Sequence, residues 1–182
     1  HENYRLWLTS MPCTYFPVPI LQNGVKMTNE PPRGLRANML RSLTLLETWT
    51  SFDELEGVNG LGVWRKLVFA LCFFHATLQE RRRFGALGWN ITYEFNDSDL
   101  EAGVLLLKMF LEEQPSVPFD ALHYMTAVNG YGGRVTDFLD ERCIETMLNV
   151  FYNDRCAYDD DFRLESSGKY YIPPNGSIDT FK

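Results

Sequence analysis

The stretch VWRKLVFALCFFHATLQERRR, residues 63–83, decides the fold of this chain. On a helix, its apolar residues leave almost no polar face through the first four turns. A helix that is apolar nearly all round is buried among other elements. Its last residues, Arg81 to Arg83, put cations where the helix dipole favours them, and Gly85 is placed to end it. The sequence therefore predicts a core helix here.

Further helices are predicted on both sides of this core helix. Apolar residues recur at helical spacing from about 33 to 46, after Pro31-Pro32, and from about 97 to 113, where Asn96 or Asp97 is a natural cap. Pro118 opens the next helix, and a last long one runs from about 135 to 152. Residues 48–62 indicate a short helix and a loop, and residues 129–133, rich in glycine, indicate a tight loop.

Short strands are predicted at the two ends of the chain. Residues 4–9 alternate in the manner of a strand, with Leu6 and Leu8 on one face, and residues 170–172 form a second apolar run before two prolines. Between the first strand and the bundle, Asn23-Gly24 is typical of a turn. The predicted fold is mainly α, a bundle of about five helices with a short strand at each end.

The composition excludes several classes of function. A net charge of -7 and a pI near 5.0 argue against a nucleic-acid-binding protein. The longest apolar stretch, residues 67–76, is too short to cross a bilayer and contains His75, so no membrane partner is expected. The four cysteines show no paired spacing, which favours buried free thiols in a reducing compartment. The chain starts without Met in strand-like sequence, which predicts a piece of something longer.

Patterns for catalysis and for metals are weak. No phosphate-binding loop is present, so the sequence predicts no ATP hydrolysis by this chain alone. The three histidines lack zinc spacing with the cysteines, and residues 158–162 match a calcium loop only in charge. Cys72 and His75 lie three residues apart and could share a helix face, as in a Cys–His hydrolase. The simpler interpretation places both in the core, with His75 bonded to a carbonyl or carboxylate.

Two arginine sites allow more than one interpretation. Gly132-Gly133-Arg134 precedes a helix, where backbone amides and an arginine can meet an anion. The alternative is that Arg134 pairs with Asp137 or Asp140 one turn later. The run from Arg81 to Arg83 could contact an acidic partner, or it could simply be the exposed end of its helix.

Several blocks of sequence closely resemble, in order, the axonemal dynein heavy chains near the C-terminal end of their motor ring. The stretch from Gln22 to Asn29, QNGVKMTN, is similar to axonemal rather than cytoplasmic dyneins. Together the blocks span nearly the whole chain, with little match at 44–62 and 154–169. They are residues 5–10, 21–32, 34–38, 72–76 with 79–81, 85–91, 93–96 with 98–100, 131–135, and 170–174 with 176–177.

The resemblance implies a place in the last of six AAA+ modules. Residues 1–47 would be the end of that module's large subdomain, residues 48–156 its small α-helical subdomain, and residues 157–182 the start of the C-terminal domain. Arg134 falls where such subdomains place a sensor-2 arginine, a position that is vestigial in a module without a phosphate loop. The resemblance implies no catalytic, cofactor-binding or metal-binding residue in this chain, with Mg-ATP serving the full-length motor.

The resulting hypothesis is a non-catalytic segment of a minus-end-directed microtubule motor of the ciliary or flagellar axoneme, part of the cytoskeleton. Its partners would be neighbouring AAA+ modules and the C-terminal domain of the same chain, and, through the full-length protein, microtubules and other dynein chains. Neither nucleic acid nor membrane is expected. Two alternatives remain at this point: a stand-alone helical protein-binding module, and a hydrolase using Cys72 and His75.

Overall fold

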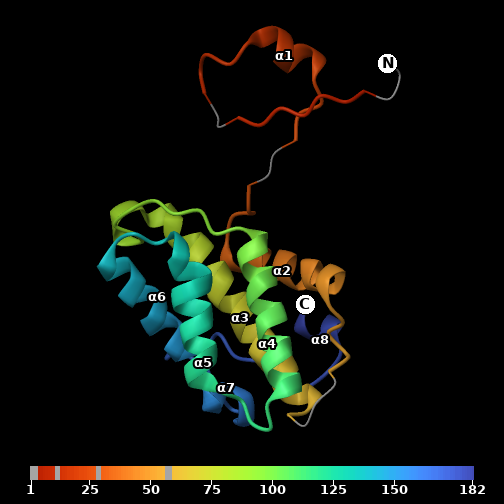
Figure 1. The fold of residues 1–182 in the computed structure, drawn as a ribbon, viewed down its shortest axis with the longest axis vertical. Helices are drawn as coiled ribbons and strands as arrows, with labels where there is room; N and C mark the ends of the chain where they lie inside the picture. Colours follow the sequence, from red (N-terminus) through yellow and green to blue (C-terminus); the bar gives the residue numbers. More distant parts are fainter. Residues whose placement is uncertain (1–3, 11–12, 28–29, 56–58) are drawn as a thin grey trace. The chain divides into compact units, whose positions relative to one another are not determined.

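The chain folds into two units that the computed structural model separates at residue 30. They are His1–Glu30 and Pro31–Lys182, and each is treated by itself (Figure 1). The structure describes residues 4–10, 13–27, 30–55 and 59–182. Residues 28–29 of the similar block 21–32, and residues 56–58 of the segment 48–62 that was expected to form a short helix and a loop, lie outside the described residues.

The first unit contains one short helix, α1 (Val18–Asn23), within its described residues. Pro17 precedes the helix and Pro19 lies in its first turn, where a missing N–H costs nothing. Gly24 ends it, at the turn that the sequence predicts. The strand expected at 4–9 is absent from residues 4–9 of the structure. A strand needs the backbone hydrogen bonds of a neighbour, and alternation along the chain does not supply that neighbour.

The second unit is a helical bundle built around α3 (Leu61–Arg81), as predicted (Figure 1). Helices α2 (Leu35–Trp49), α4 (Asp97–Glu113), α6 (Phe138–Phe151) and α7 (Asp154–Tyr158) all pack against it. A short 3₁₀ segment, η1 (Arg82–Leu87), follows α3 and turns at Gly85, whose φ is 55°. The mainly α fold, with the five expected helices, is confirmed.

The centre of α3 is buried all round, as its sequence predicts. Side chains from Leu67 to Ala76 lie in the core, which extends to Trp64, Leu107 and Leu148. By length and composition alone, the helical segment Leu61–Leu87 would be long and apolar enough to cross a membrane. Because 72% of that window is buried within the protein, its apolar surface is already covered, as in the core helix of a soluble fold.

The loop expected at 129–133 is helical instead. Helix α5 (Phe119–His123) runs directly into a π-helix, η2 (Tyr124–Tyr131), and then into a 3₁₀ turn, η3 (Gly132–Arg134). A Cβ at Gly132 would come within 2.4 Å of the carbonyl oxygen of Ala127, so this close backbone path requires glycine. The glycines therefore serve a wide helical turn rather than a loop. The short helix expected at 48–62 is also absent from 50–55 and 59–60.

The C-terminal segment packs into the same core. The strand expected at 170–172 is reduced to one isolated bridge, between Arg163 and Tyr171. Beyond it, α8 (Ile178–Phe181) inserts Phe181 edge-on against Phe52 and Phe69, with ring centroids 5.1 and 5.6 Å apart. The other buried side chains of this segment are Phe162, Leu164, Ile172 and Ile178.

Candidate functional site

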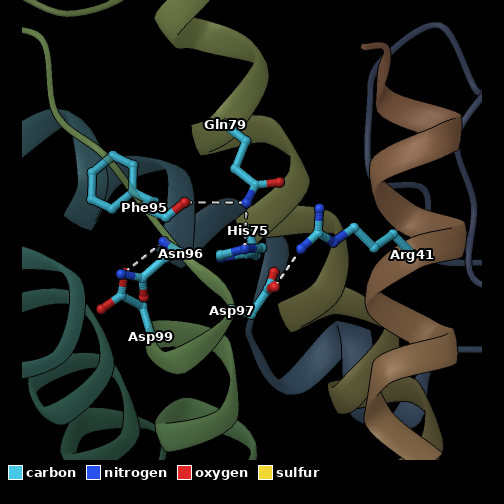
Figure 2. A network of polar contacts seen from close by, with 7 residues as sticks. All are labelled: Arg41, His75, Gln79, Phe95, Asn96, Asp97 and Asp99. Carbon is cyan, nitrogen blue, oxygen red and sulfur yellow. Dashed lines mark hydrogen bonds and ion pairs between the residues drawn. The ribbon is translucent and has the colours of Figure 1, made fainter. Parts of the chain in front are cut away.

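A polar network joins α2, α3 and α4 at one end of the bundle. Figure 2 shows His75 and Gln79 on α3 facing the start of α4, with Arg41 reaching across from α2. His75 is 1% exposed. Its Nδ1 lies 2.9 Å from the Tyr131 hydroxyl, and its Nε2 lies 2.8 Å from Nε2 of Gln79. A histidine that sequence reasoning places in the core thus connects α3 to the π-helix.

The protonation of His75 follows from its partners. Gln79 Nε2 also donates to the backbone carbonyl of Phe95 at 3.2 Å, which fixes the orientation of the amide (Figure 2). The second N–H of that amide must then donate to Nε2 of His75, so the imidazole is neutral and Nδ1 donates to Tyr131. Burial lowers the pKa of His75 to about 4; nearby Asp97 raises it and Arg41 lowers it, both by smaller amounts. Geometry and electrostatics agree that the ring is uncharged.

The hydrolase hypothesis does not survive this geometry. Cys72 is fully buried, and burial raises the pKa of its thiol to about 12. Such a thiol is not ionised near neutral pH, whereas a nucleophilic cysteine needs a thiolate and partial exposure. Both ring nitrogens of His75 are engaged by Tyr131 and Gln79, so the imidazole has no free nitrogen to act on Cys72. The core interpretation is right, with a hydroxyl and an amide as partners rather than a carbonyl or carboxylate.

The start of α4 holds the acidic half of the network. Asn96 and Asp99 form a reciprocal capping box, in which the backbone N–H of Asn96 donates to Asp99 Oδ2 at 2.8 Å. Asp97, one residue into the helix, accepts a 2.5 Å hydrogen bond from Arg41 of α2. Acidic groups are favoured in this first turn by the helix dipole. The cap that the sequence predicts is confirmed, and it also anchors α2.

Arg134, which the resemblance places at a sensor-2 position, joins the same acidic group. Its guanidinium lies 2.9 Å from Asp99 Oδ1, and its side chain is 46% exposed. The alternative that Arg134 pairs with Asp137 or Asp140 is wrong, because the carboxylates of those two residues accept hydrogen bonds from other groups. An arginine salt bridge to the capping carboxylate closes α4 against the turn that precedes α6.

Asp137 and Asp140 hold the aromatic segment that follows η1. Asp140 is buried and accepts from the backbone N–H of Asn90 at 3.1 and 3.0 Å and of Ile91 at 3.2 Å. Asp137 caps α6 and accepts from the Asn90 side chain, and these hydrogen bonds, that of Asn90 first, lower its pKa. Sequence reasoning missed this role, since backbone N–H groups carry no signal in the amino-acid pattern.

The arginines at the end of α3 are engaged within the bundle. Arg81 lies over the ring of Trp89, 5.0 Å from its centroid, and donates to the carbonyl of Gly88 at 2.8 Å. Arg82 pairs with Glu94, and Arg83 with Glu80, each at 3.0 Å. These contacts within the chain explain the three arginines without a separate acidic partner molecule.

Other candidate ligand sites are also accounted for. Among the residues that the structure describes, no group of three or more His, Cys, Asp or Glu side chains is placed to hold a metal ion. Within the acidic run at 158–162, Asp160 accepts from Lys66 at 2.7 Å, which lowers the pKa of the carboxyl.

Comparison with known proteins places this bundle in a family. The model of the dynein heavy chain AAA lid domain matches residues 64–182, which include most of α3 and every later element. The chain belongs to the dynein heavy chains. The model of the dynein heavy chain region D6 P-loop domain matches residues 1–28, almost the whole of the first unit.

Individual dynein heavy chains match along the whole sequence. The chain is 50% identical over 182 residues to dynein axonemal heavy chain 12 of Mus musculus and 51% identical over 181 residues to dynein axonemal heavy chain 3 of Homo sapiens. It is 44% identical over 182 residues to the dynein-1-beta heavy chain of the flagellar inner arm I1 complex of Chlamydomonas reinhardtii. The chain spans 6%, 4% and 4% of the length of these relatives, and they cover 100% of it.

The expected family is therefore confirmed, and its relatives are axonemal or flagellar. The chain is a dynein heavy chain segment of the axonemal type, with the cilium or flagellum and its cytoskeleton as its location. The AAA lid assignment agrees with the helical bundle of the second unit.

Proposed function

We propose that this chain is a non-catalytic segment of the ring of an ATP-driven, minus-end-directed microtubule motor, and that it transmits conformational change within that ring. The observation that carries the proposal is the salt bridge from Arg134 to Asp99. Arg134, at the proposed nucleotide-sensing position, joins α4 to the turn before α6. Its guanidinium therefore has an anionic partner without a nucleotide.

The packing of the second unit suits this role. Helix α3 contacts α2, α4, α6 and α7, and its middle turns are fully buried. Interiors packed this closely have low compressibility, so a displacement at one helix is passed on rather than absorbed. The Arg41–Asp97 and Arg134–Asp99 pairs add fixed points between elements far apart in sequence.

The proposed partners are other parts of the same heavy chain. We assign residues 1–47 to the end of the sixth AAA+ large subdomain, residues 48–156 to its small subdomain, and residues 157–182 to the start of the C-terminal domain. In the first unit, Leu6 is 67% exposed and Trp7 is 79% exposed, which suits a strand whose sheet is supplied by the rest of the P-loop domain. Mg-ATP and microtubules would bind other parts of the full-length protein.

Isothermal titration calorimetry of this chain with Mg-ATP tests the proposal. We expect no binding heat, because no phosphate-binding loop is present and Arg134 is neutralised by Asp99. Helical circular dichroism and a cooperative unfolding transition would first establish that the sample is folded. A micromolar dissociation constant for Mg-ATP, lost in an Arg134→Ala variant, would contradict the non-catalytic assignment.

A further inference from the structure

The first turn of α2 has no cap of its own. Its N-cap residue is Gly34, with φ of 99°, which has no side chain to accept a hydrogen bond, and no acidic residue lies in its first turn. In α4 the backbone N–H of the N-cap residue, Asn96, donates to the side chain of Asp99, the third residue of the helix. The third helical residue of α2 is Ala37, whose side chain cannot accept a hydrogen bond. The start of α2 therefore needs an acceptor from elsewhere.

Glu80, near the end of α3, supplies that acceptor. Its Oε1 accepts from the backbone N–H of Gly34 at 2.6 Å and from Nδ2 of Asn38 at 3.0 Å. Its Oε2 accepts from Arg83 at 3.0 Å, and the Glu80 side chain is only 17% exposed. One carboxylate thus completes, from 46 positions away in the sequence, the cap that α4 makes locally.

Asn38 is committed to the same contact. Its Nδ2 also donates to the carbonyl of Gly34 at 3.2 Å, while its Oδ1 is buried without a partner among the described residues. A buried acceptor left unsatisfied costs free energy, so this orientation persists because the two hydrogen bonds of the amide nitrogen hold it. Asn38 and Gly34 are therefore fixed together against Glu80.

Glu80 is unfavourably placed with respect to its own helix. It lies in the last turn of α3, where the dipole disfavours an acidic group and favours a cation such as Arg81. A residue that breaks a local rule without a local gain points to a role in another element. Here the gain is on α2, whose positive N-terminal end meets the carboxylate.

We propose that Glu80 is a latch that fixes the point at which the connector Pro31–Gly34 joins the bundle. With the latch closed, a displacement of the connector reaches α3 directly and α4 through the Arg41–Asp97 pair, instead of being lost by fraying of the first turn of α2. The inference deepens the proposed function and rests on it, since it names where movement passes into the ring segment.

Amide hydrogen exchange measured by NMR on this chain tests the latch. Pro31 and Pro32 carry no N–H, so Gly34 is one of the first amides of the connector that can report. In a Glu80→Ala variant, exchange at Gly34 should become about tenfold or more faster, because the N–H loses a charged acceptor. In Glu80→Gln, which keeps a neutral oxygen acceptor, the exchange rate at Gly34 should lie between the rates of Glu80→Ala and the native chain.

Glu94→Ala is the matched control. It removes one carboxylate from a 3.0 Å pair with Arg82, next to Arg83, while α2 keeps its contact with Glu80. Exchange at Gly34 should stay at the native rate in this control. Native exchange at Gly34 in Glu80→Ala would overturn the latch and leave the ATP titration result intact. Equal acceleration in both variants would also overturn it, since that result indicates general loosening of the bundle.

Discussion

His75 makes the stability of the fold depend on pH. Its ordinary pKa of 6.5 applies in the unfolded chain, and burial lowers it to about 4 in the folded protein. Between these values the unfolded state binds the proton and the folded state does not. The free energy of unfolding should therefore fall by about 3 kcal/mol as the pH falls from 6.5 to 4.

Urea denaturation at a series of pH values measures this loss. A His75→Gln variant should lose stability less steeply over the same range, so the gap between the two proteins should narrow as the pH falls. The lowered pKa values of Asp137 and Asp160 act in a lower window, near and below their ordinary 3.8, where their stabilisation is lost. Parallel pH profiles for the native chain and the variant would show that His75 is protonated in the fold.

At the first turn of α4, substitutions can separate the contribution of the Asn96 cap from that of the Arg134–Asp99 salt bridge. Asn96→Ala removes the N-cap side chain and should lower the free energy of unfolding by about 1 kcal/mol. Arg134→Ala removes a partner that is 46% exposed, and solvent screening should limit its cost to less than about 1 kcal/mol. Chemical denaturation of the two variants checks the order. A larger loss for Arg134→Ala than for Asn96→Ala would mean that the salt bridge, not the cap, holds α4.

At the scale of the whole molecule, no described side chain of the first unit is buried, whereas the core of the second unit includes its C-terminal segment. Deleting residues 1–30 should therefore shift the thermal midpoint by less than about 3 °C. Deleting residues 157–182 removes buried side chains such as Ile178 and Phe181, each worth about 2–5 kcal/mol, against a total stability of about 5–15 kcal/mol. We expect that truncation to abolish cooperative unfolding.

Differential scanning calorimetry of the two truncated chains gives the comparison. If the chain ending at residue 156 unfolded as sharply as the full chain, the C-terminal segment would be an appendage rather than part of the core. Such a result would favour the proposed domain boundary at 157 as a folding boundary too.

Much of the helical fold could be predicted from the sequence, because it depends on local pattern. The apolar run at 63–83 indicates burial all round, and α3 is buried. Asn96 or Asp97 is a natural helix cap in the sequence, and the helix starts there, with Asn96 as its N-cap. The helical period of the same run also predicted that Cys72 and His75 lie in the core, and both are buried. In each case the deciding interaction lies within about four residues along the chain.

Tertiary structure decided which polar groups meet. The partners of Arg134, His75 and Glu80 are Asp99, Tyr131 and Gly34, each supplied by a separate element. The strands expected at both ends did not form among the described residues. A strand needs a neighbouring strand to pair with, and alternation along the sequence does not show whether such a neighbour exists. Helical period and capping are local properties of the chain, so the amino-acid pattern determined the helices. Hydrogen-bond partners across the bundle depend on how those helices pack, so only the folded molecule determined the network.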